Sequence, residues 1–242
     1  HSLITGVSEI KSLNLKHPGW SGDENVLNNS FWSKVDRMML EKHGIELTKV
    51  QFNLNNLLQS NDLNLNQNKL AFETILDIAK KRIVSDASKT PNRLETLLSS
   101  ELFKVRVVYL VRDGRAIVHA YRRKYGSWFT GWSNLMGIDR AAKRLMKKYG
   151  SKNWLTIRYE DMVTNLEGTI KKICSFNNVN FESSMLVPDT SKFNGLGGNR
   201  IRKTQIKNIK IDNAWKTEMS TLMRVFTALT VSSFNRRHGY SD

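Results

Sequence analysis

The sequence predicts an α/β fold in which helices flank a mostly parallel sheet. Short segments rich in β-branched residues end in charged or turn residues, as buried parallel strands do, at 82–85, 105–111 and 154–159. Segments with the apolar spacing of helices lie before, between and after them. This alternation of strand and helix is typical of a sheet whose strands run in the same direction.

The first helix is expected from Ser30, a candidate N-cap. The residues that follow it place an apolar face at Trp32, Val35, Met38 and Met39. We therefore expect this helix to pack against the core with one side.

The later helices are placed by similar patterns. Apolar residues recur over 70–78, before the first strand, and a helix is expected to begin near Ala116, after the second. A helical insert is predicted from about Trp128 to Tyr149. Thr164 and Glu167 have the T-x-x-E form of a capping box, which predicts that the next helix starts there.

Two apolar stripes follow the third strand, and their helical spacing predicts buried faces. The first contains Leu166, Ile170, Ile173 and Cys174, and the second contains Trp215, Met219, Leu222, Met223, Phe226 and Leu229. The single cysteine is thus expected to be a buried, inert thiol.

Composition excludes several classes of protein. Hydrophobic residues make up 40% of the 242 residues, too many for a disordered chain, and one cysteine excludes a disulfide framework and a multi-cysteine zinc site. No apolar run approaches the roughly 18 residues of a membrane-spanning helix. We expect one domain covering 1–242.

The net charge of +16 points to an anionic partner. Nucleic acid, an acidic membrane surface, an acidic acceptor and a polyanionic cofactor all fit, and charge alone does not choose among them. In parallel sheets ligands bind beyond the carboxyl ends of the strands, so the segments after the three strands are the places to search.

Three such segments carry candidate anion-binding groups. Arg112 and Arg115 flank Gly114 where a strand meets a helix, which favours either a phosphate site or a surface turn with solvated arginines. Lys89 follows small and polar residues after the first strand, and a lone lysine is more often solvated surface. The glycine-rich segment 195–202 is a weaker candidate for an anion cradle.

These motifs, in this order, resemble the sulfotransferase superfamily, in particular protein-tyrosine sulfotransferases and bacterial stand-alone sulfotransferases. The matching motifs are V-R-D-G-R-A-x-V-H at 111–119, D-A-S-K-T-P at 86–91, I-R-Y-E-D-M at 157–162, G-G-N-R-I-R at 197–202 and N-R-R-H-G-Y at 235–240. The resemblance implies the sulfotransferase fold, a parallel sheet like that of P-loop nucleotide-binding proteins with flanking helices.

The resemblance also implies a reaction and a set of roles. The donor would be 3′-phosphoadenosine 5′-phosphosulfate, the product adenosine 3′,5′-bisphosphate, and no metal is needed in the family. Glu9 is the candidate general base and Lys89 would stabilise the leaving phosphate. Binding of the nucleotide is assigned to Arg112, which would hold the 3′-phosphate, to Tyr159 near the adenine, and to Arg200 and Asn199 in the glycine-rich segment.

The chain departs from the family pattern in two places. Ala120 stands where the family usually has a serine that binds the 3′-phosphate, a hydrogen bond worth about 1.5–3 kcal/mol, and Lys124 or Ser127 is the candidate to compensate. The phosphosulfate-binding loop R-S-G-T/S-T/S does not occur in the 242 residues. Since the segment 1–10 resembles the part that follows this loop in the family, the resemblance implies that the first strand and loop are missing.

Other functions stay open at this point. A non-catalytic sulfotransferase-like binding domain fits the missing loop and Ala120, and a basic nucleic-acid-binding protein fits the charge, although no nucleic-acid-binding motif is present. The acceptor is unknown: a peptide, a glycan or a small molecule, offering a hydroxyl or an amine. A cytoplasmic location is expected, with the Golgi lumen as the alternative if an anchor precedes the chain. His119 is interpreted as structural.

Overall fold

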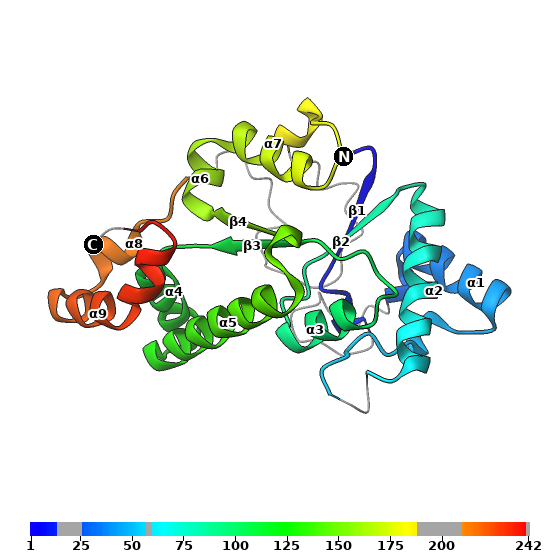
Figure 1. The fold of residues 1–242 in the computed structure, drawn as a ribbon, viewed down its shortest axis with the longest axis horizontal. Helices are drawn as coiled ribbons and strands as arrows, with labels where there is room; N and C mark the ends of the chain where they lie inside the picture. The colour runs from blue at the N-terminus through cyan, green and yellow to red at the C-terminus, as the bar shows by residue number, and fades with distance from the viewer. Residues whose placement is uncertain (14–25, 57–59, 188–209, 241–242) are drawn as a thin grey trace. The chain divides into compact units, whose positions relative to one another are not determined.

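The computed structural model describes residues 1–13, 26–56, 60–187 and 210–240. The chain divides into two compact units, which are described separately: His1–Val105 with Glu182–Lys207, and Arg106–Phe181 with Asn208–Asp242. The expectation of a single domain stays a prediction. In each unit two strands pair in parallel and helices accompany them, so the predicted α/β class is confirmed (Figure 1).

The first unit is built around one parallel strand pair. Its elements are β1 (Ile4–Ser8), α1 (Ser30–His43), α2 (Asp62–Ala79), β2 (Ile83–Asp86) and α3 (Pro91–Ser99), with short 3₁₀ helices at Ile10–Ser12, Val26–Asn28, Leu47–Lys49 and Ser183–Leu186. Strands β1 and β2 are in register from Ile4 opposite Ile83 to Ser8 opposite Asp86, with an irregularity between Gly6 and Ser8. The sequence did not predict β1.

The core of the first unit joins the strands to helices α1 and α2. Trp32, Val35 and Met39 of α1 are buried together with Val7 of β1 and Ile75 of α2. The apolar face predicted for the first helix is therefore largely confirmed. Its N-cap is wrong by one residue, because the side chain of Asn29 accepts the first amide hydrogen bonds.

The second unit contains the other strand pair and most of the helices. Its elements are β3 (Val107–Val111), α4 (Gly114–Tyr125), α5 (Trp128–Tyr149), β4 (Trp154–Arg158), α6 (Tyr159–Thr164), α7 (Leu166–Phe176), α8 (Ala214–Glu218) and α9 (Thr221–Arg237), with a 3₁₀ helix at Ser151–Asn153. Strands β3 and β4 pair residue by residue from Val107 opposite Trp154 to Val111 opposite Arg158. Helices α6 and α7 lie on one side of this pair and α4 and α5 on the other (Figure 1).

Helix α9 corrects one prediction. The apolar stripe through Leu222, Phe226 and Leu229 is exposed, not buried. The buried face of α9 is instead Thr227, Val231, Phe234 and Asn235, of which Val231 and Phe234 join the core of the unit. Hydrogen bonds of Asn235 fix this face toward the start of α4, and they outweigh the apolar spacing.

Two local predictions around α7 can also be compared with the structure. The capping box at Thr164 and Glu167 is wrong: α6 ends at Thr164, and the side chain of Asn165 accepts from the Gly168 amide at 3.0 Å to cap α7. Cys174 is 2% exposed, as its position on the apolar stripe predicted.

Candidate active site

Glu9 and Lys89 meet at one end of the first strand pair. Glu9 directly follows β1, and Lys89 lies three residues after β2. Because the strands are parallel, their carboxyl ends lie at the same edge. Lys89 Nζ is 2.8 Å from Glu9 Oε1; the Glu9 side chain is 19% exposed and that of Lys89 is 68% exposed. The structure thus brings the candidate base and the candidate lysine together.

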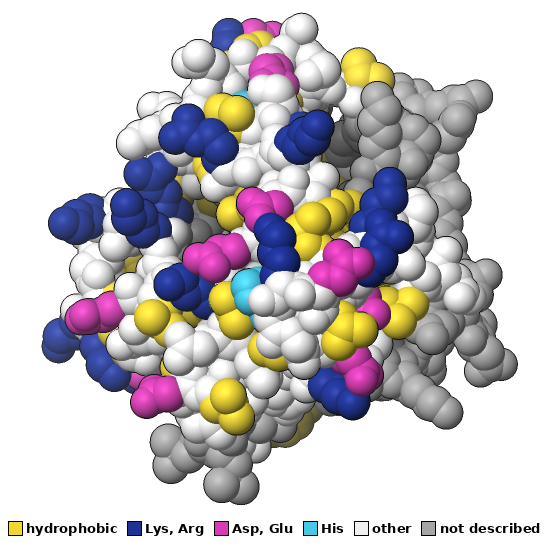
Figure 2. All heavy atoms as spheres, turned by 90° about the vertical axis from the view of Figure 1, so that its right-hand side faces the viewer, with side chains coloured by type: hydrophobic (Ala, Val, Ile, Leu, Met, Phe, Trp, Pro, Cys, Tyr) yellow, Lys and Arg dark blue, Asp and Glu magenta, His cyan; other side chains and the backbone are white. Residues whose placement is uncertain are grey.

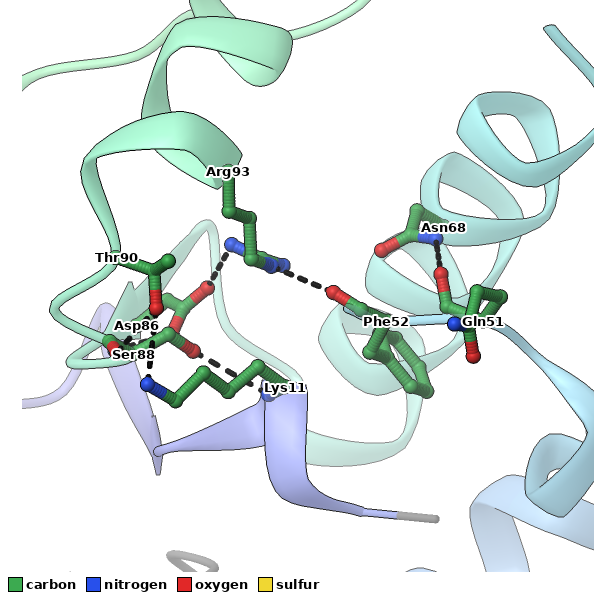
Figure 3. A network of polar contacts seen from close by, with 8 residues as sticks. All are labelled: Lys11, Gln51, Phe52, Asn68, Asp86, Ser88, Thr90 and Arg93. Carbon is green, nitrogen blue, oxygen red and sulfur yellow. Dashed lines mark hydrogen bonds and ion pairs between the residues drawn. The ribbon is translucent and has the colours of Figure 1, made fainter. Parts of the chain in front are cut away.

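The loop from Asp86 to Thr90 presents Lys89. Asp86 Oδ1 accepts from both the amide and the hydroxyl of Ser88, at 2.9 and 2.5 Å, and the Thr90 hydroxyl donates to the Ser88 carbonyl at 3.1 Å. Lys11 Nζ donates to Thr90 Oγ1 at 2.9 Å (Figure 3). Lys89 itself has φ of 56°, in the left-handed region that a residue with a Cβ rarely adopts.

An ion pair with a buried arginine lies behind this loop. Arg93 Nη1 is 2.7 Å from Asp86 Oδ2, and Arg93 Nε donates to the Phe52 carbonyl at 2.8 Å (Figure 3). The Arg93 side chain is 3% exposed, and burial lowers its pKa, against the raising effect of the Asp86 charge and hydrogen bond. No local pattern in the sequence predicted this role for Arg93, because nothing local marks an arginine as buried.

Arg112 directly follows β3 in the second unit, as Glu9 directly follows β1 in the first. Its Nη2 donates to the Asp212 carbonyl at 2.6 Å and lies 3.2 Å from Asp212 Oδ2. Its guanidinium lies 4.8 Å from the ring centroid of Tyr159, the first residue of α6. Arg112 Nε is buried and has no hydrogen-bond partner within the part of the chain that the structure describes. Arg112 and Tyr159 are therefore brought together, with one donor still unpaired.

Asp212 is a second residue of the site that no sequence pattern predicted. Burial acts to raise its pKa, but hydrogen bonds from the Ala214 amide and from Arg112 outweigh this, and the pKa is lowered. Asp212 stays ionised and neutralises part of the Arg112 charge. It lies 100 residues further along the chain, and no sequence signal connects the two.

The turn after Arg112 is held by buried polar contacts. Asp113 caps α4 by accepting from the Arg115 amide at 2.9 Å, and its carboxylate pairs with the Arg115 guanidinium at 2.8 Å. Asn235 accepts from the Gly114 amide at 2.9 Å and donates to Asp113 Oδ1 at 3.2 Å. The helix begins at Gly114, two residues before the predicted start at Ala116.

A pocket of about 300 Å³ opens beside this turn. Arg115, Glu160, Trp215 and Tyr240 line it together with Asp212. The Tyr240 hydroxyl donates to Glu160 Oε2, and burial together with that hydrogen bond raises the pKa of Tyr240 above its usual value. The pocket is a small polar hollow at the carboxyl end of the strand pair.

The remaining predicted nucleotide-binding residues stand apart. Lys124 lies in the last turn of α4, exposed, with Nζ 5.0 Å from the Tyr125 ring, whereas Arg112 precedes the first turn. At about 1.5 Å per residue, the helix separates the two by its whole length. Ser127 caps α5 through the Thr130 amide. Asn199 and Arg200 lie outside the described residues.

His119 has a structural environment. Its side chain is 3% exposed, its Nε2 lies 2.9 Å from Glu218 Oε2, and its ring lies 5.8 Å from that of Trp128. It ties α4 to α8 and α5, in agreement with the structural interpretation.

A larger pocket of about 610 Å³ lies elsewhere in the second unit, along β4. Its main feature is Asp139, which is 3% exposed and contacts Arg237 at 2.6 Å, Lys143 at 2.8 Å and His238 at 3.5 Å. Burial alone would raise the pKa of Asp139, but the hydrogen bonds from His238 and Lys143 and the Arg237 charge lower it to about 2. Burial, with the Asp139 charge, raises the pKa of Tyr109 to about 12. Sequence reasoning missed this cluster.

Surface charge was a separate argument for an anionic partner. On the face shown in Figure 2, Lys and Arg side chains lie among acidic and hydrophobic ones and form no continuous patch among the described residues. None of the helices described is long and apolar enough to cross a membrane. Within the same part of the chain, no group of three His, Cys, Asp or Glu side chains is placed to hold a metal ion.

Comparison with known proteins identifies the family. The sequence model of the sulfotransferase family matches residues 16–183, more than half of the chain. The chain therefore belongs to the sulfotransferase family, and the resemblance seen in its motifs is confirmed. No curated protein matches it.

One of three similar solved structures supports this fold. The sulfotransferase domain of the curacin biosynthetic pathway aligns with 99% of this chain and 97% of its own, at a TM-score of 0.52 and 15% identity. The sulfotransferase domain of the olefin synthase of Synechococcus PCC 7002 aligns with 95% of this chain and 94% of its own, at a TM-score of 0.48 and 16% identity. Retinol dehydratase, solved with androsterone and the inactive cofactor PAP, aligns over 97% and 80%, at 0.39 and 15%. At these identities the first of the three supports the fold alone.

Proposed function

We propose that this chain transfers a sulfuryl group from 3′-phosphoadenosine 5′-phosphosulfate to a hydroxyl or amine acceptor. Glu9 is the general base and Lys89 the electrostatic stabiliser in the first unit. In the second unit Arg112 holds the 3′-phosphate and Tyr159 contacts the adenine; Lys124, at the far end of α4, has no part in this site. Asn199 and Arg200 are proposed to contact the nucleotide phosphates. Family membership supports the reaction class, and the remaining assignments are our proposal.

The contact between Glu9 and Lys89 is the observation that carries this proposal. A carboxylate beside an ammonium at 2.8 Å, at the carboxyl end of a parallel strand pair, gives a proton acceptor and a cation at one place. A carboxylate oxygen of Glu9 would take up the proton from the hydroxyl or amine of the acceptor substrate. Lys89 would stabilise negative charge as the bond to the leaving phosphate breaks, and its 68% exposure leaves the ammonium accessible.

The surroundings of Arg112 fit a phosphate. Its Nε lacks a partner among the described residues, so one donor remains for a ligand oxygen, and a phosphate would gain a second donor by displacing Asp212 from Nη2. The Tyr159 ring beside it offers an aromatic face. The donor supplies the sulfuryl group; the residues of this chain bind it, orient it and take up the proton.

Calorimetric titration with adenosine 3′,5′-bisphosphate tests the proposal. We expect binding by the unaltered chain and a loss of about 10- to 100-fold in Arg112→Ala, since a hydrogen bond to a charged group contributes about 1.5–3 kcal/mol. Arg140→Ala is the matched control, because Arg140 is an exposed arginine of α5 whose Nε donates to its own helix, and it should leave affinity unchanged.

Each other outcome points to an alternative. Binding that does not depend on Arg112 contradicts the assigned phosphate site. Nucleotide binding without transfer of ³⁵S from the labelled donor to peptide, glycan or small-molecule acceptors would indicate the non-catalytic binding domain. No nucleotide binding, together with DNA binding that weakens steeply with salt, would indicate the nucleic-acid-binding protein.

A further inference from the structure

Lys89 has a backbone conformation that it does not prefer. Its φ of 56° lies in the left-handed region, which is unfavourable for a residue with a Cβ unless its surroundings hold it there. In this conformation its ammonium meets Glu9 at 2.8 Å. The geometry of the candidate active site therefore depends on what holds the residues on either side of Lys89.

Both neighbours of Lys89 are held by side-chain hydrogen bonds. Ser88 is fixed by Asp86 through its amide and its hydroxyl, and the Lys11 amide donates to the Ser88 hydroxyl oxygen at 3.3 Å. Thr90 is fixed by its bond to the Ser88 carbonyl and by Lys11 Nζ. These bonds converge on Asp86 and Lys11 (Figure 3).

Asp86 is fixed in turn from the core. Its Oδ1 holds Ser88 and its Oδ2 receives Arg93 Nη1, so both carboxylate oxygens are used. Arg93 cannot shift without losing its second bond, from Nε to the carbonyl of Phe52, a residue that is 1% exposed. The two bonds leave the guanidinium in different directions, toward the loop and toward the core (Figure 3).

We propose that Arg93 is a positioning residue that holds Lys89 beside Glu9, acting through Asp86 and Ser88. The proposal rests on the role assigned to Lys89 above. Arg93 does not contact the reacting groups itself. Its planar guanidinium spans the core carbonyl and the loop carboxylate at once, which a lysine, with one compact ammonium, cannot do.

Arg93→Lys keeps the charge and removes the fork, so it tests geometry. The NMR signal of Lys89 can be observed in protein whose lysines carry ¹³C-methyl groups. The signal that is absent in Lys89→Arg belongs to Lys89. The change in its chemical shift in Glu9→Gln shows the effect of losing the ion pair. We expect Arg93→Lys to move the Lys89 signal toward its position in Glu9→Gln. Leu97→Ala is the control for general loss of stability, because Leu97 is buried in the same helix, α3, and lies outside the loop. It should leave the Lys89 signal in place.

Nucleotide binding gives the functional consequence. Adenosine 3′,5′-bisphosphate carries the 5′-phosphate that Lys89 would contact, and adenosine 3′-phosphate lacks it. The unaltered chain should prefer adenosine 3′,5′-bisphosphate to adenosine 3′-phosphate. This preference should fall about tenfold in Arg93→Lys and in Lys89→Ala, and it should stay unchanged in Leu97→Ala. A structural role alone would weaken both ligands equally.

A Lys89 signal that stays at its original position in a folded Arg93→Lys protein overturns the proposal, as does a shift of the same size in Leu97→Ala. If Arg93→Lys does not fold, Ser88→Ala breaks the same series of contacts one step later and should give the same shift. If the signal moves but the unaltered chain binds neither nucleotide, the positioning role stands and the proposed function fails.

Discussion

The two units hold their candidate site residues in different ways. In the first unit Asp86 is held by near neighbours in the chain: Ser88, two residues further along, and the buried Arg93, seven residues further along. In the second unit Asp113 is secured by Arg115 and by Asn235, which lies 122 residues away, and further buried polar contacts come from the same C-terminal segment. Segment 235–240 contains Asn235, Arg237, His238 and Tyr240, which contact Asp113, Asp139 and Glu160.

This difference shows that two similar strand ends are stabilised by opposite means. The first depends mainly on one ion pair, in which Arg93 is 3% and Asp86 17% exposed, and the second on several contacts spread over the end of α9. A single substitution at the ion pair should therefore lower the stability of the first unit strongly. In the second unit each single substitution should lower the stability by a smaller amount.

The largest effect is expected for Asp86→Asn. It leaves the Arg93 charge, 3% exposed, without its carboxylate, and breaking a buried pair in this way costs about 3–5 kcal/mol. Urea unfolding measures the loss. Glu41→Gln is the control, because its pair with Arg37 is exposed on both sides and contributes at most about 0.5 kcal/mol. A loss below about 1 kcal/mol in Asp86→Asn would refute the dependence on one pair.

The next largest effect is expected from acid, which should remove the contribution of Asp139 to the free energy of unfolding. Its pKa is lowered from 3.8 to about 2, so it contributes about 2 kcal/mol of stability above pH 4, which is lost as the pH falls through 2. About half should be gone by pH 3. The difference in unfolding free energy between the unaltered chain and Asp139→Asn should shrink accordingly. Asp77→Asn, at an exposed pair with Lys42, should show no such change.

Asn235→Ala should cost less, about 1.5 kcal/mol. It leaves the buried Gly114 amide without its acceptor and removes one donor from Asp113, while the cap and Arg115 remain. Thermal unfolding compared with Ser233→Ala, an exposed site on the same helix, measures it. A loss as large as that of Asp86→Asn would erase the contrast between the units.

The smallest change in stability is expected for Glu9→Gln. Because the Lys89 side chain is 68% exposed, this ion pair contributes at most about 1 kcal/mol. Transfer of ³⁵S, in contrast, should be lost, because an amide cannot accept the proton. Full activity in this variant would contradict the assignment of Glu9 as the base.

Local patterns predicted much of the fold. The three predicted strands appear as β2, β3 and β4, and the insert at Trp128–Tyr149 coincides with α5, because apolar spacing and turn residues act over a few residues. Strand β1 was missed, since the resemblance placed its residues after a strand. The face of α9 was wrong because Asn235 makes polar contacts with residues that local spacing cannot anticipate.

The candidate site was predicted unevenly for the same reason. Motifs located Glu9, Lys89, Arg112 and Tyr159, and the structure brings them together in two pairs. It does not bring Lys124 to Arg112. The supporting residues Arg93 and Asp212 escaped notice, because burial and contacts across 100 residues are set by the folded chain.

The single cysteine is a natural probe of local unfolding in the second unit. Cys174 is 2% exposed on α7, so a thiol reagent reaches it only when that helix opens. The rate of its labelling therefore measures how often α7 opens, with no engineered probe. Slower labelling on addition of nucleotide would report tightening of this unit at a site far along the chain from Arg112.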